Sequence, residues 1–145
     1  MAITQAIANA FKKQLLEGDQ NFSSGGDVFK LALYTSSATL NSATTSFTTT
    51  NEVANSGQYT SGGGDLTGQN TSIASGVAIV DFADLSFTGV TLTARGALIY
   101  NTSSAVTDAA VAVLDFGADK TATSGTFTVQ FPAFTTAAAI LRISG

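Results

Sequence analysis

Four aspartates near the ends of predicted strands are the residues whose types and spacing could best support chemistry. They are Asp81, Asp84, Asp115 and Asp119, and they fall in two similar stretches of sequence. Converging carboxylates could bind a hard cation such as calcium, which takes several oxygen ligands. Their spacing matches no helix-loop-helix calcium loop, and turn capping by the aspartate side chains is the favoured interpretation. We therefore predict no metal and no cofactor, and treat these carboxylates as weak candidates only.

Two side chains that are central to many catalytic mechanisms, Cys and His, are absent. The chain has no Cys and no His, so it contains no thiol nucleophile, imidazole base or zinc site of the nitrogen and sulfur type. No Ser lies in a Gly-x-Ser-x-Gly elbow. The Gly-rich stretch 61–68 lacks the Gly-Lys-Ser/Thr that completes a phosphate-binding loop. We predict that the protein is not an enzyme.

Composition and charge limit the classes of partner that the protein could bind. The 145 residues carry six basic and ten acidic side chains, and only 11% of the residues are charged, against about 25% in a typical soluble domain. An acidic chain is not expected to bind nucleic acid. No apolar run is long enough to span a membrane, and the N-terminus lacks the basic segment of a signal peptide. We expect a protein that is made in the cytoplasm, without export and without membrane contact.

One amphipathic helix is predicted, over residues 4–17. Apolar side chains recur there at intervals of four: Ile3, Ile7, Phe11 and Leu15. This spacing forms one face of a helix. Thr4 is placed to cap the N-terminus, and Gly18 is placed to end the helix in the left-handed conformation.

The rest of the chain has the pattern of strands and loops. Residues 28–34 predict a first core strand, and residues 36–76 form a Thr/Ser/Gly-rich excursion in which we expect short strands or pinned turns. The main strands fall within residues 76–143, at 76–82, 85–88, 90–100, 111–116, 125–131 and 137–143. The predicted fold is mainly β, a single antiparallel β-sandwich or jelly-roll-like domain over residues 1–145 with one N-terminal helix.

The apolar stripe of the helix has two interpretations. Packing of Ile7, Phe11 and Leu15 on the sandwich is the favoured one. The alternative is that the stripe docks on a neighbouring subunit, since an N-terminal helix can readily be shared between copies.

Several blocks of the sequence resemble a family of small structural proteins of tailed bacteriophages. The blocks are residues 1–18, 29–40, 93–101 and 112–117, and the similarity covers essentially the full length. These blocks form strands and the helix, so they identify a family without identifying a site. The resemblance implies a virion component, with a capsid decoration or cement protein favoured and a tail or neck protein as the alternative. It supplies no catalytic residues.

A decoration role implies particular partners. The protein would bind the major capsid protein or other virion proteins on the capsid exterior, and binding only the assembled shell would stabilise that shell. We expect a homo-oligomer, with a trimer favoured.

Two rival functions stay open. The first is a tail receptor or glycan-binding module, in which Tyr34, Tyr59 and Tyr100 would be exposed stacking platforms. The second is a hydrolase of host envelope polymers, which the missing base and nucleophile disfavour.

Overall fold

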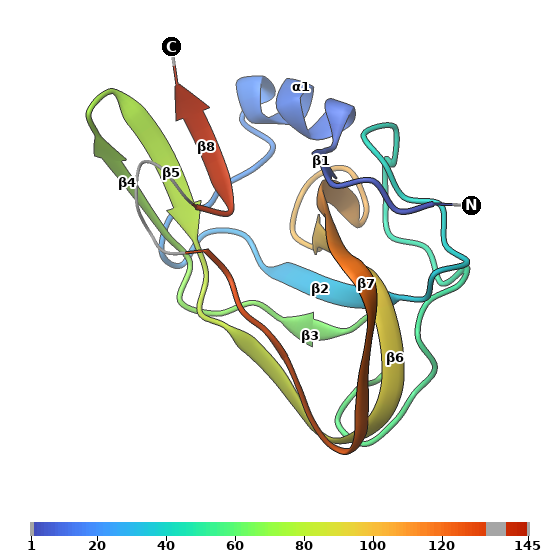
Figure 1. The fold of residues 1–145 in the computed structure, drawn as a ribbon. Helices are drawn as coiled ribbons and strands as arrows, with labels where there is room; N and C mark the ends of the chain where they lie inside the picture. Colours follow the sequence, from blue (N-terminus) through green and yellow to red (C-terminus); the bar gives the residue numbers. More distant parts are fainter. Residues whose placement is uncertain (1, 133–138, 145) are drawn as a thin grey trace.

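A computed structural model describes residues 2–132 and 139–144 of the chain (Figure 1). The fold is mainly β, with antiparallel sheets and one short helix, as predicted. The elements in chain order are β1 (Ala6–Ile7), α1 (Asn9–Glu17), β2 (Phe29–Tyr34), β3 (Gly64–Asp65), β4 (Asn70–Ala74), β5 (Val77–Asp81), β6 (Leu85–Asn101), β7 (Ala109–Val129) and β8 (Leu141–Ser144).

The strands form two sheets that share one apolar core. The larger sheet has the order β1-β7-β6-β2-β3, and the smaller has the order β4-β5-β8. Figure 1 shows the smaller sheet beside α1, with β8 on the side nearer the helix. Every residue of β2 except Lys30 is buried, as expected for the predicted core strand at residues 28–34. The predicted two-sheet β architecture is confirmed.

Strands β6 and β7 form one long ribbon that bends back on itself (Figure 1). The pairing shifts register between Phe87 and Val90 and again between Val90 and Leu92. The bend is sharp enough that Phe116 and Phe127, both on β7, have ring centroids only 6.1 Å apart. Bulges of this kind bend and twist a ribbon.

The ribbon corrects the predicted strand boundaries. Four predicted strands, at 85–88, 90–100, 111–116 and 125–131, merge into β6 and β7, and the turn expected between 116 and 125 is absent. The intervening residues of β7 instead pair with β6, as in Thr93 with Thr121 and Ala94 with Lys120. The Gly and Ser residues in this stretch lie at bulges and do not end the strand, because β6 runs beside β7 and pairs with it. Residues 137 and 138 of the last predicted strand lie outside the described residues.

The helix starts later than predicted. Residues 6–7 form β1 and pair with Val113 and Ala112 of β7, and α1 begins at Asn9 without a side-chain cap. Thr4 therefore caps nothing, and its N–H donates to the Leu40 carbonyl at 2.9 Å. Residues 6–7, which the apolar periodicity assigned to a helix, pair instead with the free edge of β7. The predicted C-terminus is right, since Gly18 ends α1 with φ 81°.

The excursion over residues 36–76 is pinned, as expected. It contains β3 and β4, and single bridges join Glu52 to Tyr34 and Ser46 to Ala109. Four of its isolated apolar residues are buried: Leu40, Val53, Tyr59 and Leu66. Phe47 is half-buried, and Ile73 is 74% exposed.

A cluster of phenylalanines joins the helix, the large sheet and the segments beside the small sheet. Its members are Phe11 of α1, Phe22, Phe29 of β2, Phe82 and Phe131. The rings of Phe22 and Phe29 stack with centroids 4.3 Å apart, and Phe11 meets Phe22 edge-on at 5.8 Å. Such pairs stabilise beyond the area that they bury. This phenylalanine cluster fixes α1 and the start of β6 relative to β2.

Replacing Phe22 with Ala should destabilise the fold strongly. The side chain is buried at the centre of the cluster, so a loss of about 3–5 kcal/mol in the free energy of unfolding is expected. Urea denaturation followed by circular dichroism measures it. The matched control is Phe116→Ala on the ribbon, where the half-buried ring should cost about 1 kcal/mol. Equal losses in the two variants would contradict the central place of the cluster.

Candidate functional site

An apolar groove separates α1 from the small sheet. It encloses about 750 Å³. One wall is formed by β1 and α1, through Ile7, Phe11, Leu15 and Leu16. The facing wall is formed by β5 and β8, through Ala78, Val80, Leu141 and Ile143.

The sheet wall of the groove is built by strand register. Ile73 of β4 pairs with Ala78 of β5, which pairs with Ile143 of β8. Directly opposed residues in antiparallel strands project from the same face, so these three side chains form one row across the sheet. Val80 and Leu141 belong to the next row on that face. On β4 that row continues with Thr71, which also lines the groove, so the face that borders the groove is apolar on β5 and β8 and mixed on β4.

Exposed apolar side chains gather around this groove. Among the described residues, five large hydrophobic side chains are exposed. Two of them line the groove, Leu16 at 90% and Ile143 at 58% exposed, and Ile73, at 74% exposed, lies in the same row as Ile143 without lining the groove. Exposed apolar side chains at the edge of a groove mark a candidate interaction site.

The charges at the rim are positive. Lys12 and Arg142 line the groove, and among its described lining residues there is no carboxylate. The acidic side chain nearest in sequence is Glu17, which forms an ion pair with Lys13 at 2.7 Å on the outer face of α1. The groove is thus an apolar cleft with a basic rim on a chain of net charge −4.

The structure divides the predicted interface residues between core and groove. Phe11 is buried in the phenylalanine cluster, and Ile7 and Leu15 are half-buried against the core. Packing on the chain's own sheets, the favoured interpretation, accounts for most of the stripe. Leu16 also lines the groove, but it was not among the predicted interface residues because it falls outside the four-residue repeat.

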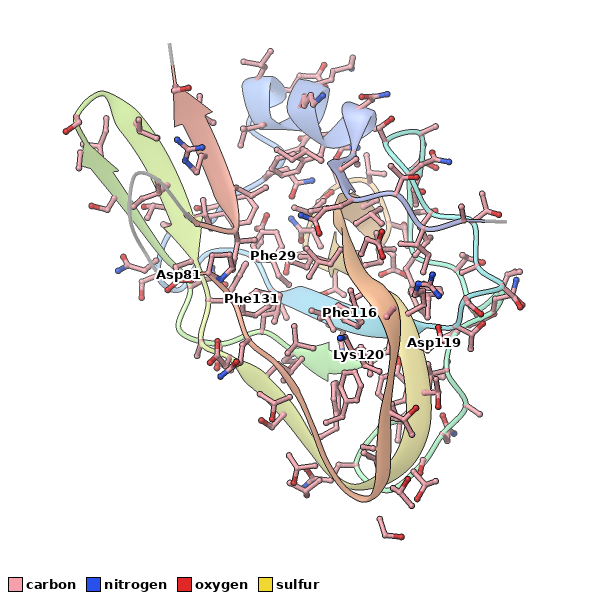
Figure 2. All side chains as sticks on the ribbon, viewed as in Figure 1. Phe29, Asp81, Phe116, Asp119, Lys120 and Phe131 are labelled. Atoms are coloured by element: carbon pink, nitrogen blue, oxygen red, sulfur yellow. The ribbon has the colours of Figure 1, made fainter. Side chains whose placement is uncertain are left out.

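The four candidate carboxylates do not converge. Asp84 accepts the Phe131 N–H at 2.9 Å, Asp115 accepts the Gly117 N–H at 2.9 Å, and Asp119 pairs with Arg95 at 3.0 Å. Figure 2 shows Asp81 and Asp119 far apart in the molecule. No three residues of the described part that could ligate a metal lie close together. Asp115 forms the Asx-type turn that the sequence predicted.

Asp81 has a different environment. Its Oδ1 atom is buried and accepts no hydrogen bond from the described residues. A single carboxylate provides too few oxygen ligands for a calcium ion, and the other three candidates are engaged elsewhere. Asp81 by itself does not form a site.

The three tyrosines are buried, and the prediction of exposed stacking platforms is wrong. Tyr34 and Tyr59 are 0% exposed and Tyr100 is 3% exposed. Burial raises the pKa of each phenol well above its usual value of 10.0. A ring with one accessible face is needed to stack on a sugar, so the glycan-binding alternative loses its proposed residues.

The tyrosine hydroxyls instead anchor the excursion to the large sheet. Tyr34 donates to the Thr48 carbonyl at 2.6 Å, and Tyr100 donates to the Gly62 carbonyl. Tyr59 donates to Glu52 at 2.8 Å while accepting the Leu33 N–H at 2.8 Å. These bonds explain why a loop with so few apolar residues is ordered.

A buried amide network is a second feature that the sequence did not reveal. The Asn101 side chain is 0% exposed and donates to Gln20 at 2.8 Å and to Asp27 at 2.7 Å. Its Oδ1 accepts the N–H groups of Ser103 and Ser104. The partners Gln20 and Asp27 are 81 and 74 positions away in the chain, so no local sequence pattern could predict these contacts.

Comparisons of the chain with protein-family models, curated proteins and solved structures found no match. The resemblance to phage structural proteins therefore remains a prediction. No helix of the described residues is long and apolar enough to cross a membrane.

High pH should unfold the protein and ionise its tyrosines in one transition. Above about pH 10 the unfolded chain loses its phenolic protons while the folded chain keeps them. The unfolded state then binds fewer protons, so the free energy of unfolding falls as the pH rises and is unaffected by these groups below that range. Tyrosinate absorbance and circular dichroism should change together, because all three tyrosines of the chain are buried. Tyrosinate that appears before unfolding would contradict this.

Replacing Asn101 with Ala should cost about 3 kcal/mol of unfolding free energy, because several buried groups lose their partner at once. Urea denaturation measures the loss. Asn70→Ala on exposed strand β4 is the matched control, with a change within about 0.5 kcal/mol expected. A neutral Asn101→Ala variant would show that the network does not hold the loop.

Proposed function

We propose that this protein is a structural component of a bacteriophage virion, a capsid decoration protein that binds the assembled shell and stabilises it through protein–protein contacts. The observation that carries the proposal is the hydroxyl-lined outer face of the bent ribbon formed by β6 and β7. The sequence resemblance to tailed-phage structural proteins supports the same role.

This outer face of the ribbon is suited to contact with another protein. Hydroxyl pairs cross between its strands, Ser86 with Thr128 and Thr93 with Thr121, each at 2.8 Å. Side chains that already hold one another lose little freedom when a partner binds. Interfaces are also depleted of Lys and Glu, and only 11% of this chain is charged.

The stabilisation would be thermodynamic. A protein that binds the assembled shell and not its separated subunits shifts the equilibrium toward the shell by mass action. The gain is about 2.7 kcal/mol per site when the free protein is at about a hundred times its Kd. A homo-oligomer that engages neighbouring capsid subunits would add the avidity of linked sites.

Phage particles that lack this protein should rupture at a lower temperature than complete particles, and added purified chain should restore the difference. The loss of mass-action stabilisation is the physical reason. Release of DNA to a fluorescent dye during heating measures rupture. Unchanged rupture together with lost adsorption to host cells would contradict the decoration role and favour a tail protein.

The position of the protein in intact particles distinguishes a decoration protein from a tail or neck protein. An antibody against the chain should label the whole capsid surface in electron micrographs. Label confined to one vertex or to the tail would replace the decoration role with a neck or tail role.

A further inference from the structure

Leu16 stands on the rim of the groove and does not fill it. It is 90% exposed although it lines the apolar cleft. The other exposed residues of α1 are polar: Asn9, Lys12, Lys13 and Glu17. Burying a leucine side chain is favourable. The groove of the same copy does not bury Leu16, so an apolar surface on another molecule would.

A protrusion beside a cavity on one helix suits a two-fold contact. In such a contact the same surface occurs on both sides, so each copy's protrusion meets the other copy's cavity. Leu16 and the groove adjoin one another on α1, so one axis beside the helix serves both. A three-fold contact would use two different surfaces of each copy.

The charges of α1 also complement those of a second copy. Glu17 does not line its own groove but follows Leu16 directly in the chain. A partner that inserts Leu16 therefore brings a carboxylate to the basic rim at Lys12. In an antiparallel pair of helices, the Glu17 end of each lies beside Lys12 and Lys13 of the other, where opposite charges attract. A parallel pair would instead place like charges together.

We infer that the groove is occupied by α1 of a second copy of this chain, with Leu16 of each copy inserted into the other's groove across a two-fold axis. The inserted side chain packs on the apolar face of the small sheet, near Val80 and Ile143. The small sheet and α1, which are separated within one copy, are then bridged by the partner's helix. The contact gives the protein two copies of any surface that binds the shell, and it does not depend on the proposed virion role.

Sedimentation velocity of the purified chain over a concentration series tests the inference. The wild-type chain should form a dimer. Leu16→Glu should weaken it roughly 30-fold or more, the loss typical of a buried interface anchor. Leu16 is almost fully exposed in a single copy, so the variant should fold normally, as circular dichroism will check. Val106→Glu, at another exposed apolar position, is the matched control and should leave the dimer intact.

Charge reversal tests the antiparallel arrangement. Glu17→Lys should weaken the dimer, because it places three cations of each helix beside those of the other. The triple variant Lys12→Glu, Lys13→Glu, Glu17→Lys should restore it, since each attraction between the two helices is kept with its sign reversed. A wild-type monomer at all concentrations, a trimer, a dimer indifferent to Leu16→Glu or a triple variant that stays weak would overturn the inference. Particle rupture is measured separately, so either proposal can fail alone.

Discussion

The packing of five phenylalanine rings is the constraint on which the rest of the structure depends. Phe22 stacks on Phe29 of β2, receives Phe11 of α1 edge-on, and contacts Phe82 at the junction of the two sheets. A nine-residue helix is not stable alone, and the small three-stranded sheet needs its apolar face covered. Their attachment to β2 through these rings sets the distance between them, and that distance is the width of the groove.

Where apolar residues are scarce, buried polar groups hold the segments of the chain in place relative to one another. Asn101 ties the end of β6 to Gln20, which in turn donates to Gln14 of α1 at 2.8 Å. Glu52 accepts hydrogen bonds from Tyr59, Ser61 and Gly62. Satisfied networks of this kind specify one arrangement, because a shifted loop would leave buried groups unpaired. Buried amide, carboxylate and phenol groups thus hold the loops in one arrangement against the sheets.

A surface fixed by such contacts is consistent with a function based on binding other proteins. The exposed apolar residues are concentrated where α1 faces the small sheet, whereas the four candidate aspartates are dispersed over turns, an ion pair and one buried position. The proposals therefore concern partners: a viral shell for the molecule as a whole and a second copy for the groove. Both follow from which side chains remain uncovered in one copy.

The amino-acid sequence alone determined the β class, the core strand at 28–34, the pinned excursion and the end of the helix at Gly18, because alternation and helix-ending glycines act over a few residues. Tertiary structure decided the rest. Residues 6–7 joined β7 because a free strand edge was there to pair with, and residues 117–124 stayed extended because β6 ran beside them. The burial of the tyrosines and the exposure of Leu16 depend on contacts between segments far apart in the chain, which no local pattern encodes.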